Sequence, residues 1–121
     1  PRLMKKWVRE ANIEAATVKD LFEKIAASHV RFERIHPFSD GNGRTGRMIV
    51  NQQLINSGFL PVSIPPTGKY REAFRRYDKS EDLSEMVYVL LKSELESFDR
   101  VRSLAQKFAL DREKQKSETI S

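Results

Sequence analysis

Apolar residues recur three or four positions apart along most of this chain, the spacing of one buried helix face. Similar patterns predict helices over residues 1–13, 15–35 and 69–77. Two further helices are expected, one from the end of the 36–47 loop to residue 56 and one that begins at about residue 83. The clearest pattern lies before residue 36 and consists of Val18, Leu21, Phe22, Ile25, Phe32 and Ile35. We therefore expect an all-α fold, with five or six helices around a central loop and the helix that follows it.

Turn-forming residues separate the predicted helices in the middle of the chain. Asn56-Ser57-Gly58 is a helix stop signal, and Pro65-Pro66-Thr67-Gly68 is a turn. The apolar run between them, 59–64, is expected to connect helices, since a lone strand would have nothing to pair with. Asp82 or Ser80 then caps the next helix.

Beyond this cap, a stripe through Leu83, Leu90 and Leu95 predicts another helix, and apolar residues continue after Phe98. From about residue 112 the sequence is polar, so we predict a tail of low order. The expected organisation is one core domain over residues 1–111 and a polar C-terminal tail over 112–121.

The composition excludes several classes of protein. The 121 residues include no cysteine, so disulfides and thiolate sites are excluded. No run of eighteen apolar residues and no signal-peptide pattern is present, so we expect no membrane partner and a cytoplasmic location. The 22 basic against 17 acidic side chains are scattered without a nucleic-acid motif, so we expect no nucleic-acid partner.

One loop concentrates residues suited to chemistry: His36-Pro37-Phe38-Ser39-Asp40-Gly41-Asn42-Gly43-Arg44-Thr45-Gly46-Arg47. Its glycines allow the backbone to approach a ligand closely, and it leads into the start of a helix. The N–H groups and dipole at a helix start attract phosphate. Arg44 and Arg47 are three positions apart and therefore share one face, where their planar guanidiniums match phosphate oxygens.

Two further side chains of this loop extend the chemistry beyond phosphate binding. Asp40 offers a hard oxygen ligand of the kind that Mg²⁺ uses beside phosphates. His36 has an unperturbed pKa near neutrality, which suits a general base. Each feature alone is common in purely structural loops. Their combination within twelve residues favours a nucleotide site for phosphoryl or nucleotidyl transfer.

The same loop closely resembles the signature of Fic domains, H-P-F-x-[D/E]-G-N-G-R-x-x-R, at every defined position. The resemblance, which covers about residues 1–95, implies a Fic-like helical bundle and transfer of AMP from Mg-ATP to a Ser, Thr or Tyr hydroxyl of a target protein, with release of pyrophosphate. By this resemblance His36 is the base and Asp40 holds Mg²⁺. Asn42 and the backbone of 41–43 (Gly41, Asn42 and Gly43) would bind the α-phosphate, Arg44 the β-phosphate and Arg47 the γ-phosphate.

Gly43 distinguishes two reactions within the family. The related Doc kinases carry a lysine at this position and transfer a phosphate, so the glycine points to AMP transfer. Transfer of another nucleotide-derived group, or a non-catalytic regulatory module that only binds nucleotide, stays open as an alternative.

The resemblance also suggests residues outside the loop. Tyr70 and Asp78 are adenosine-contact predictions, because residues of this region close over the base and ribose in the family. His29 lies seven residues before His36 on the same helix face. We interpret it as a packing histidine, with a role in orienting the loop as the alternative. Trp7 is predicted to anchor the core or an interface.

Two familiar parts of Fic proteins are not recognisable in the sequence. Only thirty-five residues precede His36, too few for the usual N-terminal helices and the β-hairpin flap that docks the target. The inhibitory motif [S/T]-x-x-x-E-[G/N] is also not found. We therefore expect either a fragment or a reduced core, whose inhibitory helix lies elsewhere in the protein or on an antitoxin-like partner.

Overall fold

The computed structural model describes residues 2–11, 17–35, 41–65 and 68–120 of the chain. Within these ranges every regular element is a helix, which confirms the all-α prediction. The helices are α1 (Arg2–Ala11), α2 (Val18–Ile35), α3 (Asn42–Asn56), α4 (Gly68–Ser80) and α5 (Ser84–Ile120).

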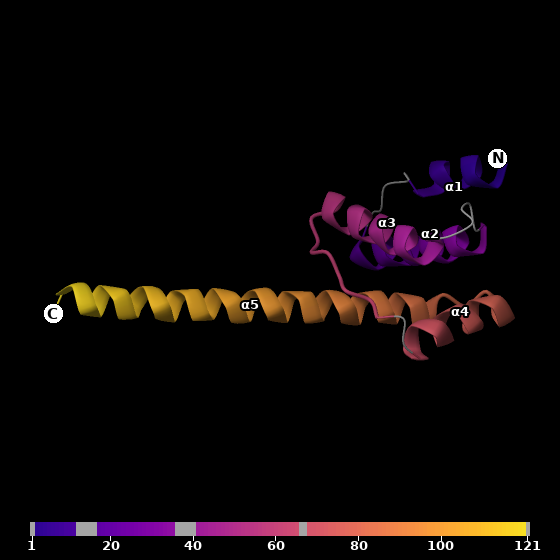
Figure 1. Ribbon diagram of the computed structural model, residues 1–121. Helices are drawn as coiled ribbons and strands as arrows, with labels where there is room; N and C mark the ends of the chain where they lie inside the picture. The colour runs from indigo at the N-terminus through magenta and orange to yellow at the C-terminus, as the bar shows by residue number, and fades with distance from the viewer. Residues whose placement is uncertain (1, 12–16, 36–40, 66–67, 121) are drawn as a thin grey trace.

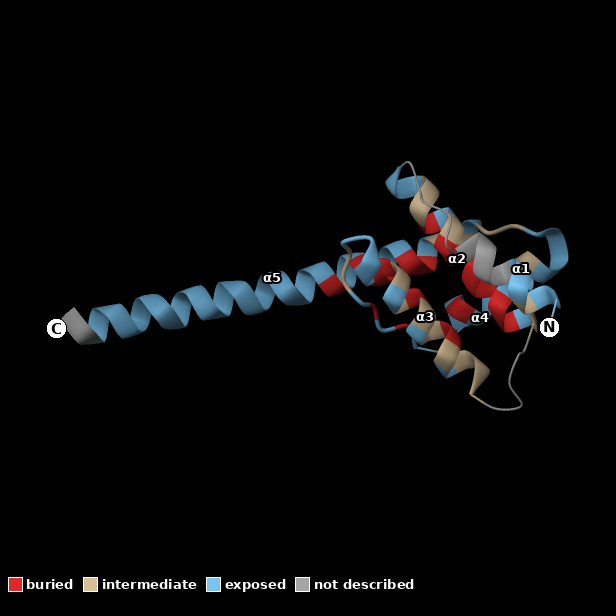
Figure 2. Cartoon of the chain, turned by 90° about the horizontal axis from the view of Figure 1, so that it is seen from above, coloured by how far each residue is buried: buried red, intermediate tan, exposed pale blue. Residues whose placement is uncertain are grey.

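The helices form a small body from which one of them projects. α1 packs on α2, α2 packs on α3, and α4 packs along the beginning of α5, which also touches α2. Figures 1 and 2 show that the rest of α5 extends away from this body, with the C-terminus far from the N-terminus.

α2 supplies the centre of the core. Thr17 caps its start, because its hydroxyl oxygen accepts a hydrogen bond from the Asp20 backbone N–H at 3.1 Å. Phe22 is completely buried, as the helical spacing predicted, and so is Val30, which was not part of the predicted pattern. They pack with residues of every later segment, namely Val50, Leu54, Val62, Ile64, Tyr70, Ala73, Met86, Val89 and Leu90.

Residues 59–65, which follow the end of α3, form no strand. α3 ends at the predicted stop, where Gly58 has a φ of 85° and donates its N–H to the Ile55 carbonyl at 3.1 Å. Side chains then replace a strand partner: the Asn51 amide bonds both the N–H and the carbonyl of Val62, at 2.7 and 3.1 Å. The Glu94 carboxylate accepts the Leu60 N–H at 2.7 Å.

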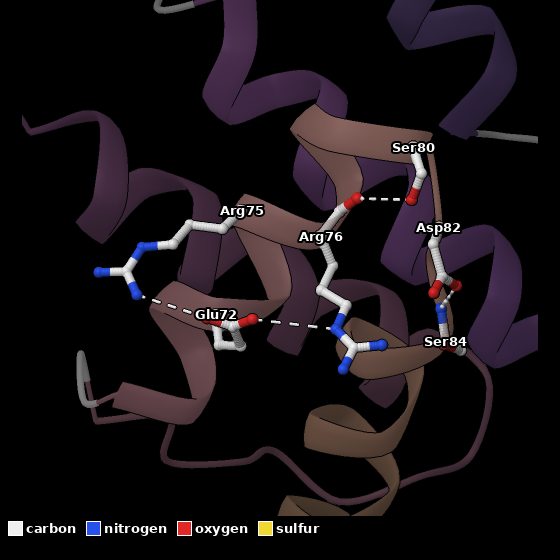
Figure 3. A network of polar contacts seen from close by, with 6 residues as sticks. All are labelled: Glu72, Arg75, Arg76, Ser80, Asp82 and Ser84. Carbon is white, nitrogen blue, oxygen red and sulfur yellow. Dashed lines mark hydrogen bonds and ion pairs between the residues drawn. The ribbon is translucent and has the colours of Figure 1, made fainter.

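The cap of α5 is Asp82 rather than Ser80. The Asp82 carboxylate accepts the Ser84 N–H at 2.9 Å, and this hydrogen bond lowers the pKa of the carboxyl group. Ser80 instead ends α4, where its hydroxyl donates to the Arg76 carbonyl at 3.2 Å (Figure 3). Glu72 lies beside both Arg75 and Arg76 on the outer face of α4, where exposed ion pairs add little stability (Figure 3).

The prediction for the C-terminal residues was wrong. Residues 112–120 continue the helix that begins at Ser84, instead of forming a tail of low order. The physical reason is local: the chain has no glycine or proline after Gly68, and Arg, Glu, Lys and Gln favour helix. The proposed division into residues 1–111 and 112–121 stays a prediction.

Candidate phosphate-binding site

The start of α3 has the backbone geometry that the loop sequence predicted. Gly41 stands immediately before the helix with φ 78° and ψ 12°, a left-handed conformation that favours glycine. Its carbonyl accepts the first helical hydrogen bond, from the Thr45 N–H at 3.0 Å. The first-turn N–H groups of a helix have no acceptor within the helix, and helix starts of this kind attract anions. Asn42 and Gly43 lie in this turn, half-buried.

The two arginines of the motif occupy different environments on α3. Arg44 is exposed, whereas Arg47 is half-buried. The Arg47 side chain folds back along the helix, so that its Nη1 atom lies 3.2 Å from the point where a Cβ on Gly43 would stand. One guanidinium is therefore held against the first turn of the helix, beside the backbone that would receive a phosphate.

Gly43→Ala should weaken ATP binding without lowering the stability of the fold. A Cβ at 3.2 Å from Nη1 would push the Arg47 guanidinium away from the first turn. Alanine in place of a helical glycine adds roughly 0.5–1 kcal/mol of stability. We expect an unchanged or higher melting temperature together with weaker ATP binding in titration calorimetry. Lower stability, or unaltered ATP affinity, would contradict this account of Gly43.

Behind Arg47 lies a buried polar pair that joins α2 to α4. His29 Nε2 and the Tyr70 hydroxyl are 2.6 Å apart, and their rings stack with centroids 5.7 Å apart. Arg47 lies close enough to Tyr70 to oppose the rise in the pKa of the Tyr70 hydroxyl. His29 thus packs in the interior as expected, but its bond to Tyr70 could not be foreseen from sequence spacing.

The interior keeps both members of this pair neutral at pH 7. Burial, and to a smaller extent the charge of Arg47, lower the pKa of His29 to about 4, while the carbonyl of Gly46 acts in the opposite direction. Burial also raises the pKa of Tyr70 to about 12, with the Glu33 carboxylate adding to the rise and Arg47 opposing it.

His29 should make the fold sensitive to mild acid. Because its pKa falls from 6.5 to about 4 on folding, the unfolded chain binds more protons between these values, and stability decreases as the pH drops through that window. We expect a loss of about 2 kcal/mol between pH 7 and pH 5. Urea unfolding at several pH values measures it, and His29→Gln should flatten the curve. An identical pH slope in that variant would rule out His29 as the cause.

α3 approaches α2 closely at a glycine that the sequence analysis did not single out. A Cβ on Gly46 would collide with the Glu33 carboxylate and would lie 3.3 Å from both His29 Cε1 and the Phe32 ring. Glu33 is itself largely buried. An isolated glycine inside a helical pattern was the signal available in the sequence.

The two residues predicted to contact adenosine already have partners within the protein. Tyr70 is only 6% exposed and belongs to the core. Asp78 accepts two hydrogen bonds from the Arg34 guanidinium, at 2.7 and 2.6 Å, which joins the end of α2 to α4. The same guanidinium lies 5.0 Å from the centre of the Phe74 ring. The adenosine role of Tyr70 and Asp78 stays a prediction.

The predicted base and metal ligand fall outside the described part of the chain. His36 and Asp40 belong to residues 36–40, which join the end of α2 to Gly41. Within the described ranges, no three His, Asp or Glu side chains gather closely enough to hold a metal ion. No helix of those ranges is both long and apolar enough to span a bilayer. Trp7 lies in α1, and its side chain is outside the description.

Known proteins resemble the segment that carries this site. The protein adenylyltransferase fic-1 of Caenorhabditis elegans is 43% identical over 54 residues, which are 45% of this chain and 11% of the relative. A probable protein adenylyltransferase of Aquifex aeolicus is 42% identical over 60 residues, 50% of this chain and 19% of the relative. The protein adenylyltransferase Fic of Drosophila melanogaster is 40% identical over 63 residues, 52% of this chain and 13% of the relative.

Solved structures extend the likeness to the fold. Two structures of Fic-1 from C. elegans match this chain with TM-scores of 0.73 and 0.63, each at 32% identity. Each match covers 82% of this chain and 30% of the solved chain. The present chain therefore corresponds to a minor part of these relatives' length. The sequence profile of the Fic/DOC family matches residues 1–54. Residues 1–54, a segment that ends in α3, thus resemble the Fic/DOC family.

Proposed function

We propose that this chain is part of a protein adenylyltransferase, which transfers AMP from Mg-ATP to a Ser, Thr or Tyr hydroxyl of a target protein. The observation that carries the proposal is the start of α3, where left-handed Gly41 opens the first turn and the Arg47 guanidinium folds back along it to Gly43. The names of the relatives, all protein adenylyltransferases, support the same reaction.

The proposed reaction assigns a task to each motif residue. The target hydroxyl oxygen bonds to the α-phosphorus while the bond to the β-phosphate oxygen breaks, and pyrophosphate leaves. His36 takes the hydroxyl proton. Asn42 and the backbone of 41–43 bind the α-phosphate, Arg44 the β-phosphate and Arg47 the γ-phosphate.

Mg²⁺ enters this proposal only through Asp40. Mg²⁺ usually takes one or two carboxylates together with substrate phosphates, so a site without a cluster of acidic residues fits it. When bound, the ion would neutralise charge on the α- and β-phosphates. An inhibitory helix elsewhere in the protein, or an antitoxin-like partner, belongs to the same proposal, because in the family it pairs with the second motif arginine, here Arg47.

Two differently labelled ATP samples test the proposed reaction. The protein is incubated with Mg²⁺, a cell lysate and ATP radiolabelled on either the α- or the γ-phosphate. AMP transfer predicts that protein bands, or the chain itself, take up label from α-labelled ATP and none from γ-labelled ATP. Uptake of the γ-label would indicate phosphate transfer instead. Nucleotide binding without uptake of either label would favour a binding module.

A further inference from the structure

We infer that Tyr70 and His29 are positioning residues, which hold the Arg47 guanidinium through a buried chain of hydrogen bonds at the place where it meets the terminal phosphate of the nucleotide. The inference rests on the proposed nucleotide site and adds to it two residues outside the motif. Neither residue needs to touch the substrate for this role.

Three helices contribute one residue each to this chain of hydrogen bonds. Arg47 comes from α3, Tyr70 from α4 and His29 from α2. The Tyr70 hydroxyl lies 2.6 Å from His29 Nε2. Arg47 is close enough to both to act on their pKa values, and a Cβ on the preceding Gly46 would lie 3.3 Å from the His29 ring. Tyr70 and His29 are only 6% and 2% exposed, so water competes little for these bonds. The Tyr70 ring is fixed by His29 on one side and by Phe74, with ring centroids 5.0 Å apart, on another.

The chemistry of the three side chains determines which group donates and which accepts in each hydrogen bond. A guanidinium only donates, so in the inferred hydrogen-bond chain the Tyr70 oxygen is the acceptor for Arg47. The phenol hydrogen is then free to donate to Nε2 of His29, and the ring proton of His29 sits on Nδ1. That atom is buried and makes no hydrogen bond in the structure, although the Gly46 carbonyl, in the residue before Arg47, acts on the pKa of the ring.

This order of donation requires that the His29 imidazole is neutral and that the Tyr70 hydroxyl keeps its proton. The shifts in pKa of His29 to about 4 and of Tyr70 to about 12 preserve these forms across the physiological range. Arginine has many rotamers, and fixing one before the ligand arrives lowers the entropic cost of binding. A nucleotide that lacks the γ-phosphate gains nothing from this arrangement.

Comparing ATP with AMP isolates the positioning role. Tyr70→Phe removes the hydroxyl and keeps the ring, and Tyr77→Phe on the same helix is the matched control. By titration calorimetry with Mg²⁺, we expect Tyr70→Phe to bind ATP roughly three- to tenfold more weakly, as for the loss of one hydrogen bond. AMP affinity should be unchanged, and Tyr77→Phe should match the original protein for both nucleotides.

Arg47→Ala separates failure of this inference from failure of the proposed site. If Arg47→Ala leaves ATP affinity unchanged, the γ-phosphate assignment itself is wrong. If Arg47→Ala weakens ATP binding while Tyr70→Phe does not, only the positioning chain is overturned. Equal weakening of ATP and AMP by Tyr70→Phe would also overturn it, in favour of direct contact between Tyr70 and adenosine.

A spectroscopic measurement tests the direction of the hydrogen-bond chain while leaving its three members unaltered. Nitrogen NMR of the histidine rings should show a neutral His29 with its proton on Nδ1 and an unprotonated Nε2 at pH 7. The chain has two histidines, so His36→Ala assigns the signals. A proton on Nε2 would make His29 the donor to Tyr70 and would refute the inference.

Discussion

Gly46→Ala should cost about 3 kcal/mol or more of unfolding free energy, at the upper end of what overpacking a close contact does. The new methyl group would have to displace the Glu33 carboxylate and would press on His29 and Phe32, at 3.3 Å each. These neighbours belong to the buried side of α2 and have little room to withdraw. Urea unfolding followed by intrinsic fluorescence measures the loss.

Gly43→Ala is the natural control for this prediction. It makes the same substitution one turn earlier on α3, where the added methyl would meet only the flexible end of Arg47. A double-mutant cycle with Glu33→Ala should show coupling, because the methyl and the carboxylate compete for one space. If Gly46→Ala were as stable as Gly43→Ala, the close approach of α3 to α2 would be refuted.

His36→Ala should reduce the transfer of AMP by at least about a hundredfold, the usual contribution of a general base. The elimination of His29 strengthens this prediction. His29 is buried, bonded to Tyr70, and has its pKa lowered to about 4, so it cannot take a proton from an incoming hydroxyl. Since the chain has two histidines, His36 is the imidazole left for the task.

The measurement compares label transfer from α-labelled ATP with ATP affinity in the same preparation. The imidazole acts on the target hydroxyl and not on the phosphates, so ATP should bind His36→Ala as it binds the original protein. Transfer at the original rate would exclude His36 as the base. Loss of ATP binding together with transfer would mean that the substitution disturbs the phosphate site instead.

The helices near the motif were predictable because their signals are local. Helical spacing located α2, and Asn56-Ser57-Gly58 located the end of α3. The continuous α5 was missed because a change from apolar to polar composition was interpreted as a structural boundary. A helix needs no buried face where its residues favour helix and no glycine or proline interrupts it.

The site was predictable only where it is contiguous in sequence. Gly41, Gly43 and Arg47 follow from the motif, and the structure places them around the first turn of α3. The supports of this turn come from distant segments: Tyr70 is 41 residues from His29. No spacing rule connects such positions, so their contact with Arg47 required the fold.

The projecting part of α5 changes how the stability of this protein has to be measured. Every residue from 98 to 118 is exposed. The turns beyond Ser97 therefore depend on backbone hydrogen bonds and local side-chain pairs such as Arg102–Asp99, and they should fray gradually with heat. Far-ultraviolet circular dichroism would add this gradual melting to the cooperative loss of the core and distort a two-state fit. Aromatic signals from the packed body avoid that mixture.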